Sequence, residues 1–232
     1  MNLPFPSPDQ IDGVLFDFHS TLVDQGDAAS WIMLAWRHAG RGGEPAGVLG
    51  AEKADQLAAW VERIWEHARE IDPESRRDLH PDTHREVYDS LVQDVPDVDD
   101  ELARSLYATM LETWIPYDDT VPVLRALHAR GIKTALVSNV GIDVRQVLDR
   151  AGLTDLLDAV VLSYEAGVVK PDITIFAQAL SMIDVPAERA LMVGDSWRDD
   201  GGAAQLGIRT LLLPRTTGPT HGLDLVLRLV GN

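Results

Sequence analysis

The sequence predicts an α/β fold, an open parallel sheet with helices between its strands, interrupted after the first strand by an all-helical insertion. Three observations lead to this prediction. A short apolar run stands alone at residues 11–16, helical periodicity without a convincing strand follows it, and apolar runs alternate with helical patterns from residue 116 onward. Such alternation is typical of βαβ units. We therefore assign residues 1–23 and 116–232 to an α/β core and residues 24–115 to a helical domain.

The first strand is predicted over IDGVLF, because this run is short, apolar and closed by polar residues. The insertion is expected to contain four or so helices, since its apolar residues recur at i, i+3, i+4 and i+7. The clearest sets are Trp31, Leu34, Ala35 and His38, and Leu57, Trp60, Val61, Ile64, Trp65 and Ala68. Two more helices are expected over 82–94 and 99–114, and the glycine-dense stretch 40–50 is expected to be a loop.

Helices and strands take turns in the second half of the chain. Helices are expected at 120–131, 143–152, 172–183 and around 201–207, and strands at 132–138, 158–163, 190–194 and 209–214. Right-handed crossovers between such strands give a parallel sheet. Its strands all end at one edge, which is where open α/β sheets bind ligands.

Composition and charge limit the classes of function. With 45% hydrophobic and 25% charged residues, the 232-residue chain is typical of a folded soluble protein. Its formal charge of −17 argues against nucleic acid and anionic membranes as partners, although a bound cation can still attract a small anion into one pocket. The chain has no cysteine, hence no disulfide or thiolate site. With no signal-peptide pattern and no long apolar run, we expect a cytoplasmic protein.

Polar side chains of several kinds follow the predicted strands. Asp17 follows the first strand, Ser138 ends the next, Lys170 lies in a later loop, and Asp195 comes directly after another strand. Each alone has an ordinary explanation as a helix cap, a turn residue or a partner of a helix dipole. Their convergence on one edge of the sheet favours chemistry over coincidence.

These residue types indicate phosphoryl transfer assisted by a cation. A carboxylate in line with a phosphorus atom held by a cation can form an acyl phosphate that water later hydrolyses. The transferring group spreads negative charge over its oxygens, and Lys170, the Ser138 hydroxyl and the amides after Asp17 would supply positive charge and donors. Asp17 and Asp195, on adjoining strand ends, would hold one hard cation through oxygen, which suits Mg²⁺.

Four motifs occur in a fixed order: DFHSTL with Asp17, VSN with Ser138, VVKPD with Lys170, and VGDSWRDDGGA with Asp195, Asp199 and Asp200. Together they resemble the haloacid dehalogenase-like hydrolase superfamily, in particular its phosphatases with an inserted helical cap. The resemblance runs over most of residues 11–213 and implies a Rossmann-like core. It also implies Mg²⁺-dependent hydrolysis of a small phosphorylated metabolite through an aspartyl phosphate.

The resemblance further implies a role for each motif residue. Asp17 would be the nucleophile and a metal ligand, and Asp195 the main metal carboxylate. The second acid of the last motif is open between Asp199 and Asp200, and the spacing in relatives with helical caps favours Asp200. The phosphate would be bound by Ser138, Asn139 and Lys170, of which Ser138 and Lys170 would also assist catalysis.

His19 is the one departure from the pattern of these phosphatases. They usually carry aspartate two residues after the nucleophile, where it protonates the leaving oxygen and then deprotonates water. The backbone carbonyl at this position, which the resemblance makes a metal ligand, is unaffected by the change. Imidazole is able to act as acid and base near neutral pH. Whether His19 does so, or only forms a hydrogen bond to the cap, is open at this stage.

Two other functions compete with phosphatase activity. Relatives that remove halide from 2-haloacids also lack aspartate at the second position of the first motif, but they need no metal and lack the carboxylate that Asp195 supplies here. A catalytically silent binding or regulatory protein would keep the fold without its acid. The substrate, which depends on cap side chains, and the oligomeric state cannot be predicted from the sequence.

Overall fold

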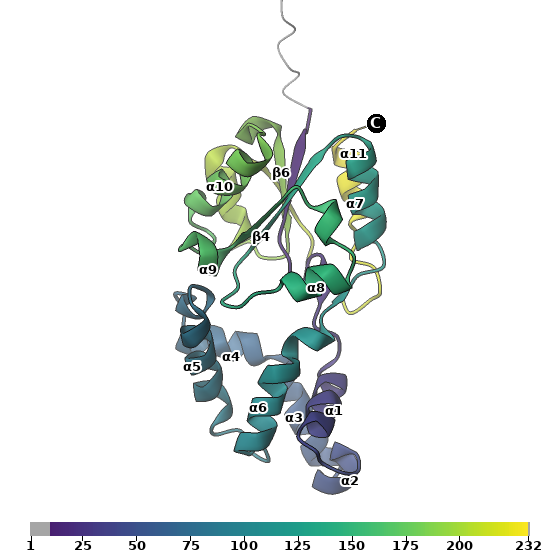
Figure 1. Ribbon diagram of the computed structural model, residues 1–232, viewed down its shortest axis with the longest axis vertical. Helices are drawn as coiled ribbons and strands as arrows, with labels where there is room; N and C mark the ends of the chain where they lie inside the picture. The colour runs from purple at the N-terminus through teal and green to yellow at the C-terminus, as the bar shows by residue number, and fades with distance from the viewer. Residues whose placement is uncertain (1–9, 232) are drawn as a thin grey trace, which may run out of the picture. The chain divides into compact units, whose positions relative to one another are not determined.

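The computed structural model describes residues 10–231 (Figure 1). The expectation that the chain begins without a signal peptide rests on residues 1–9, which lie outside this range. By their internal contacts the residues form two compact units. The α/β unit takes the chain up to Asp24 and again from Pro116 onward, and the helical unit is Gln25–Ile115.

The α/β unit contains a five-stranded parallel sheet with the strand order β5-β4-β1-β6-β7. Its strands are β1 (Gly13–Phe16), β4 (Lys133–Ser138), β5 (Ala159–Leu162), β6 (Ala190–Gly194) and β7 (Arg209–Leu212). In the register of the central strands, Phe16 pairs with Leu136 of β4 and with Val193 of β6. The three central strands therefore end side by side, and the predicted fold class is confirmed.

Helices cover both faces of this sheet, as Figure 1 shows for α10 on one side and α7 with α11 on the other. The helices of this unit are α7 (Thr120–Ala129), α8 (Arg145–Arg150), α9 (Ser163–Ala166), α10 (Ile173–Ile183) and α11 (Asp224–Leu229). Three short 3₁₀-helices accompany them, η3 (Thr154–Leu156), η4 (Ala187–Arg189) and η5 (Asp200–Leu206). Phe176 and Ala179 of α10 are fully buried in one cluster with Leu15 and Val137 of the sheet. Burial of such side chains is worth about 1.5–3 kcal/mol each.

The helix expected around residues 201–207 is a 3₁₀-helix, η5. Two adjacent glycines, Gly201 and Gly202, make this segment a poor α-helix former. The second of them is also needed for packing, because a Cβ on Gly202 would lie 2.6 Å from the carbonyl oxygen of Pro171. The segment thus runs against the loop that carries Lys170.

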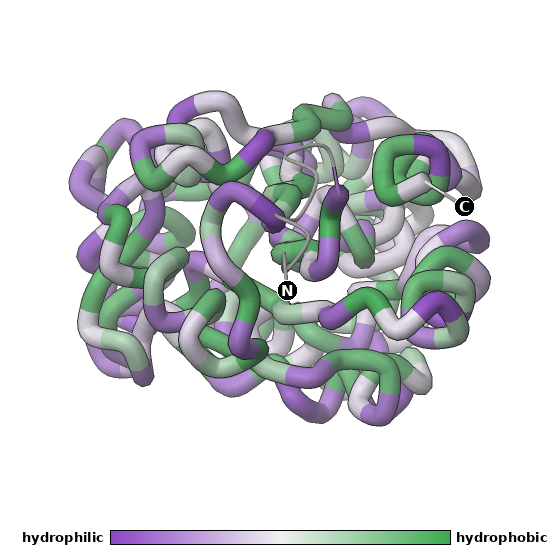
Figure 2. The backbone as a smooth tube through the Cα atoms, turned by 90° about the horizontal axis from the view of Figure 1, so that it is seen from above, coloured by the Kyte–Doolittle hydropathy of each residue, from purple (hydrophilic) through white to green (hydrophobic). Residues whose placement is uncertain are grey.

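The helical unit contains six α-helices where the sequence predicted four or so. They are α1 (Ala28–His38), α2 (Pro45–Leu49), α3 (Ala51–Glu62), α4 (Ile64–Ile71), α5 (Pro81–Val92) and α6 (Asp100–Thr109). Two short 3₁₀-helices accompany them, η1 (Arg76–Asp78) and η2 (Met110–Thr113). Seen from above in Figure 2, hydrophobic and hydrophilic residues are interspersed along the backbone of the chain, as expected for elements with one buried face.

Two predictions for this unit are wrong. The stretch 40–50, expected to be a loop, contains the short helix α2, because Pro45 is set for a helix start and Gly50, at φ 91°, ends it. The apolar pattern from Leu57 to Ala68 predicts one helix, yet the helix breaks at Arg63 into α3 and α4. The regular spacing of apolar residues continues across the break because α3 and α4 both bury apolar side chains.

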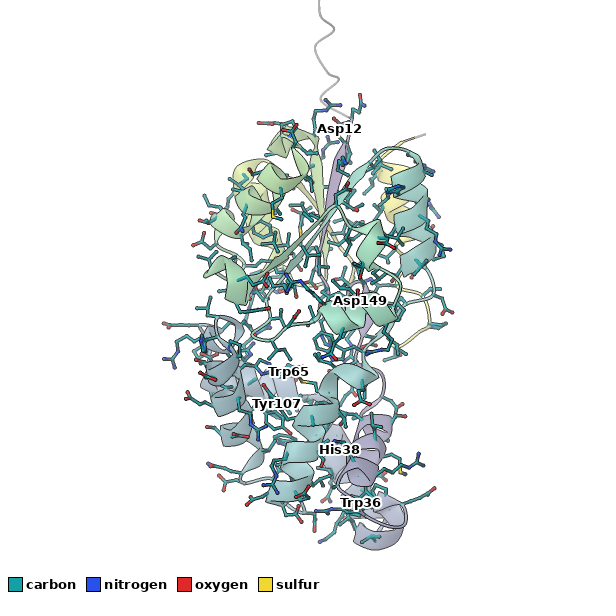
Figure 3. The ribbon with its side chains drawn as sticks, in the orientation of Figure 1. Asp12, Trp36, His38, Trp65, Tyr107 and Asp149 are labelled. Carbon is teal, nitrogen blue, oxygen red and sulfur yellow. The ribbon has the colours of Figure 1, made fainter. Side chains whose placement is uncertain are left out.

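Aromatic side chains with polar ends hold the helical unit together. The Trp31 indole donates to the carbonyl of Leu106 at 3.0 Å, which joins α1 to α6. His84 on α5 is hydrogen-bonded through Nδ1 to the Tyr107 hydroxyl at 2.9 Å. Its ring lies about 5.5 Å from those of Trp65 and Tyr107, which Figure 3 labels. Buried aromatic groups of this kind need such partners.

The chain crosses between the units at two two-residue strands, β2 (Val23–Asp24) and β3 (Ile115–Pro116), which pair as a second sheet. The sequence predicted no strand here, because two residues are too few for an alternating pattern. Among the described residues, no helix combines the length and the apolar character needed to span a lipid bilayer.

Candidate active site

The central strands carry polar side chains at their carboxyl ends. Asp17 directly follows β1, Ser138 is the last residue of β4, and Asp195 directly follows β6. The Asp17 amide donates to the carbonyl of Val193 at 2.9 Å, which fixes the end of β1 against β6. Since β4, β1 and β6 are neighbours in the sheet, the parallel register brings the three predicted residues to one edge.

Lys170 lies between two carboxylates at this edge. Its ammonium donates to Oδ1 of Asp17 at 2.6 Å and to Oδ1 of Asp200 at 2.7 Å. The Lys170 side chain is only 2% exposed. Burial alone lowers the pKa of Lys170, but the charges of Asp17 and Asp200 outweigh it and hold that pKa above the ordinary value. Lys170 is therefore a fixed positive charge at the site.

Three carboxylates surround one point. Asp17, Asp195 and Asp200 each offer an oxygen, and these oxygens lie within 4.8 Å of one another. Burial and the repulsion from the neighbouring carboxylates raise the pKa values of Asp195 and Asp200, although Lys170 counteracts the shift. Three carboxylates facing one ammonium leave an excess of negative charge. Such a set of hard oxygen donors fits a divalent cation like Mg²⁺.

The geometry distinguishes the two acids of the last motif. Asp200 is fully buried, binds Lys170, and accepts a hydrogen bond from the Ser196 amide at 2.9 Å. Asp199 instead accepts from the Ser196 hydroxyl at 2.8 Å and is not one of the three clustered carboxylates. The structure thus brings Asp200, the acid that the sequence favoured, to the other site residues.

Asn139 and Ser163 fix the loop that follows Ser138. The Asn139 carboxamide donates to the carbonyl of Lys170 at 3.0 Å and accepts from the Lys170 amide at 2.7 Å. The Ser163 hydroxyl accepts from the Val140 amide at 2.8 Å and donates to the Val140 carbonyl at 3.2 Å. Sequence reasoning missed Ser163, and its only signal was a hydroxyl at the end of the predicted strand 158–163.

The turn after Asp17 is held by its own hydrogen bonds. The amides of Thr21, Leu22 and Val23 donate to the carbonyl of Phe18, and the Ser20 amide donates to the carbonyl of Val23. The expectation that amides of this turn supply donors to a ligand is therefore wrong for these four. The Thr21 hydroxyl donates to Oδ2 of Asp17 at 3.1 Å, a contact that sequence reasoning also missed.

His19 lies in this turn, and its Nδ1 is hydrogen-bonded to the Ser20 hydroxyl at 3.2 Å. Burial lowers the pKa of His19 to about 4, against the opposing effect of the charges of Asp17 and Asp24, while Arg215 lowers it further. Arg215 itself forms an ion pair with Asp24 at 2.9 Å. The imidazole is therefore neutral around pH 7.

Known proteins with similar sequences identify the family of this chain. A family model of the haloacid dehalogenase-like hydrolases matches residues 11–207. Haloacid dehalogenase-like hydrolase domain-containing protein 3 of Danio rerio is 36% identical over 129 residues, 54% of this chain and 53% of that protein. A glyceraldehyde 3-phosphate phosphatase of Methanothermobacter thermautotrophicus is 36% identical over 101 residues, 42% of this chain and 44% of that protein.

A dehalogenase is about as similar to this chain as the phosphatase is. (S)-2-haloacid dehalogenase 1 of Pseudomonas sp. (strain CBS-3) is 35% identical over 105 residues, 44% of this chain and 46% of that protein. The chain thus spans about half the length of the curated relatives that it matches. Sequence similarity alone does not separate the two activities.

Solved structures match over nearly the whole chain. A HAD phosphatase from Thermococcus onnurineus superimposes with a TM-score of 0.63 at 21% identity, covering 95% of this chain and 98% of that chain. A 2-haloacid dehalogenase from Pseudomonas syringae pv. Tomato DC3000 gives 0.60 at 26% identity over the same shares. Fold and site together define a hydrolase with a Rossmann-like core. The chain belongs to the haloacid dehalogenase-like hydrolase family.

Proposed function

We propose that this hydrolase is a Mg²⁺-dependent phosphatase that acts on a small phosphate monoester through an aspartyl phosphate at Asp17. The observation that carries the proposal is the cluster of Asp17, Asp195 and Asp200 beside the Lys170 ammonium. A phosphatase needs both a cation site and a fixed positive charge around the transferring group. Two kinds of relatives are named for small phosphorylated metabolites: glyceraldehyde 3-phosphate phosphatase and ribulose-1,5-bisphosphate 5-phosphatase.

We propose the metal ligands from this set of oxygen donors and from the family resemblance. Asp17 and Asp195 would bind Mg²⁺, with the His19 backbone carbonyl as a further ligand and Asp200 as a ligand through water or a brace for Lys170. When bound, Mg²⁺ supplies positive charge that reduces the repulsion between the phosphate and the Asp17 carboxylate. The excess of carboxylates over cationic groups at the site supports this assignment.

The nucleophile is oriented by two contacts. Lys170 binds Oδ1 of Asp17 and the Thr21 hydroxyl binds Oδ2. A carboxylate held at both oxygens loses little rotational freedom when it attacks, which favours reaction. Ser138, buried at the end of β4, would donate its hydroxyl to a phosphate oxygen, and Lys170 would neutralise the charge that develops there.

The reaction has two steps. In the first, an oxygen of Asp17 attacks phosphorus, the bond from phosphorus to the ester oxygen breaks, and the leaving oxygen takes up a proton. In the second, water loses a proton and attacks the phosphorus of the aspartyl phosphate, which releases inorganic phosphate and restores Asp17. We propose His19, which follows the nucleophile by two residues, as the group that exchanges this proton. Its neutral imidazole takes the proton from water in the second step, whereas only its protonated form gives one to the leaving oxygen, so a pKa of about 4 should slow the first step as pH rises toward 7.

The helical unit would act as the cap. We propose residues 24–115 as the cap domain, whose side chains select the substrate, and residues 1–23 and 116–232 as the catalytic core. Helical insertions that close over a site exclude water and complete the binding pocket. The division of the chain into Gln25–Ile115 and the remainder supports this assignment.

Dehalogenation of a 2-haloacid is the second candidate function. His19 in place of an acidic residue and the similarity to (S)-2-haloacid dehalogenase 1 favour it. The acidic cluster favours phosphatase activity, because displacement of halide by Asp17 requires no cation. A silent binding protein is disfavoured, since Asp17, Lys170 and Asp195 are all present.

One screen separates these functions. The purified protein is assayed for phosphate release from a panel of phosphate esters with and without Mg²⁺, and for halide release from 2-chloropropionate. Phosphate release that depends on Mg²⁺ is expected. Halide release without added metal, together with no phosphate release from any ester, would establish the dehalogenase. Absence of both activities, together with no beryllium fluoride bound at Asp17 in the presence of Mg²⁺, would indicate the binding protein.

A further inference from the structure

We propose that Asn139 is a positioning residue for Lys170 and not a side-chain ligand of the phosphate. The inference rests on the proposed function, because it assigns a role within that site. The carboxamide of Asn139 uses its nitrogen on the Lys170 carbonyl at 3.0 Å and its oxygen on the Lys170 amide at 2.7 Å. Both polar ends of the side chain are therefore engaged with the backbone of one residue.

Lys170 needs such support because it lies outside the regular elements. It sits in the loop between α9 and α10, so no helix or strand fixes its backbone. Its ammonium nevertheless has to meet Asp17 and Asp200 at 2.6 and 2.7 Å at the end of a flexible side chain. Two hydrogen bonds to the N–H and C=O of the same residue fix its position and its rotation, as pairing with a neighbouring strand would do.

Asn139 is itself held rigidly. The next residue, Val140, is bound through both its amide and its carbonyl to the hydroxyl of Ser163, which is fully buried and begins α9 directly after β5. The preceding residue is Ser138 at the end of β4. Asn139 therefore connects the two phosphate-binding groups, Ser138 through the chain and Lys170 through hydrogen bonds, so that they keep a fixed separation.

The first test measures how firmly the two hydrogen bonds from Asn139 hold the Lys170 backbone, without any assay of activity. In Asn139→Ala, hydrogen exchange at the Lys170 amide should accelerate up to about tenfold, which corresponds to about 1.4 kcal/mol, the upper range for one hydrogen bond. Acetylation of the Lys170 amino group by acetic anhydride, which requires the ammonium to leave its carboxylate partners and lose a proton, should accelerate as well and is followed by mass spectrometry. Asp143→Ala is the matched control, because it removes a side-chain hydrogen bond to the Arg145 amide in the same loop while both bonds from Asn139 to Lys170 remain.

The second test measures the consequence for the reaction. With p-nitrophenyl phosphate and Mg²⁺, kcat of Asn139→Ala should fall by about 10²-fold, the usual cost of a displacement of about 1 Å at a reacting centre. Asn139→Asp keeps an oxygen that accepts from the Lys170 amide but replaces the donor with a charged oxygen facing the Lys170 carbonyl. Its amide exchange should lie between those of the wild type and the alanine variant, while the added negative charge near the phosphate should keep its kcat low. It also provides the test should Asn139→Ala not fold.

Unchanged exchange and acylation of Lys170 in the Asn139 variants would overturn the proposal. Faster exchange with an unchanged kcat would also overturn it, because Asn139 would then be structural only. If the wild type hydrolyses no phosphate ester, the proposed function fails, and the exchange and acylation measurements still decide whether Asn139 positions Lys170. A change in all three readouts for Asn139, with the Lys170 amide protected in Asp143→Ala, establishes the positioning role.

Discussion

Gly194 and the carboxylate of Asp200 are in direct contact at the end of β6. A Cβ on Gly194 would lie 2.0 Å from Oδ2 and 2.2 Å from Cγ of Asp200. The same carboxylate is bound by Lys170 and by the Ser196 amide, so it has no room to move aside. The glycine before Asp195 is therefore a steric requirement of the acidic cluster.

Gly194→Ala should displace Asp200 and, through it, Lys170. We expect a loss of about 1–3 kcal/mol of stability, as for other overpacked sites, and a strong loss of phosphatase activity. Gly201→Ala is the matched control, since a Cβ at that position meets no atom within 4 Å. Thermal unfolding and initial rates measured on both variants check the prediction. An active, stable Gly194→Ala protein would show that Asp200 is not fixed as described.

Asp17→Asn should abolish turnover and leave the fold intact. The amide keeps the shape of the side chain and loses the anionic nucleophile together with one metal charge. Asp12→Asn serves as the control, because Asp12 precedes β1 and lies at the opposite edge of the sheet (Figure 3). Rates and circular dichroism spectra of both variants are compared. A residual rate of about one tenth of wild type in Asp17→Asn would contradict the covalent mechanism.

Asp195→Ala and Lys170→Ala should differ in their response to Mg²⁺. Loss of Asp195 removes one of few charged ligands, so the concentration of Mg²⁺ needed for half-maximal rate should rise steeply. Loss of Lys170 removes the positive charge that would face the phosphate, so the rate should be low at every concentration of Mg²⁺. Titration of both variants with the metal checks the contrast. The roles are exchanged or absent if excess Mg²⁺ restores the two equally.

Stability of the helical unit should decrease in acid because of His84. Burial, with the charge of Arg77, lowers the pKa of His84 to about 4 from 6.5, so the unfolded chain binds this proton more readily. The stability that neutral His84 contributes is complete above about pH 6.5 and is lost as pH falls to about 4, by about 3 kcal/mol in total. Urea unfolding of the wild type and His84→Asn between pH 7 and 4 measures this loss, which should be absent from the variant's profile.

The sequence predicted the parallel sheet because each strand is a short apolar run set apart by a helical pattern. The site followed from the fold, since Asp17, Ser138 and Asp195 end neighbouring strands. The short helix α2 and the break at Arg63 did not follow, because local turn residues decide them and apolar periodicity does not. Apolar periodicity over a long stretch of sequence predicts which helical face is buried, but it does not predict where each helix ends.

Contacts between distant polar groups were also beyond the sequence. The Asn139 carboxamide meets a residue 31 positions away, and no local pattern records such a bond. The choice between Asp199 and Asp200 depended on which side chain η5 directs at Lys170. The sequence named the chemical groups, and the structure was needed to show which of them act on one another.

The proposed role of His19 in proton transfer has its own test. If His19 protonates the leaving oxygen, His19→Ala should lower the rate with an alkyl phosphate by about 10² to 10⁴. The loss should be much smaller with p-nitrophenyl phosphate, whose leaving group needs little protonation. His19→Asp should restore turnover of the alkyl ester, because it rebuilds the usual acid of related phosphatases at the same position. Ser20→Ala is the control, since it removes the hydroxyl bound to Nδ1 and leaves the imidazole in place. Equal rates of wild type and His19→Ala with the alkyl phosphate would show that His19 is structural and that the proton comes from water.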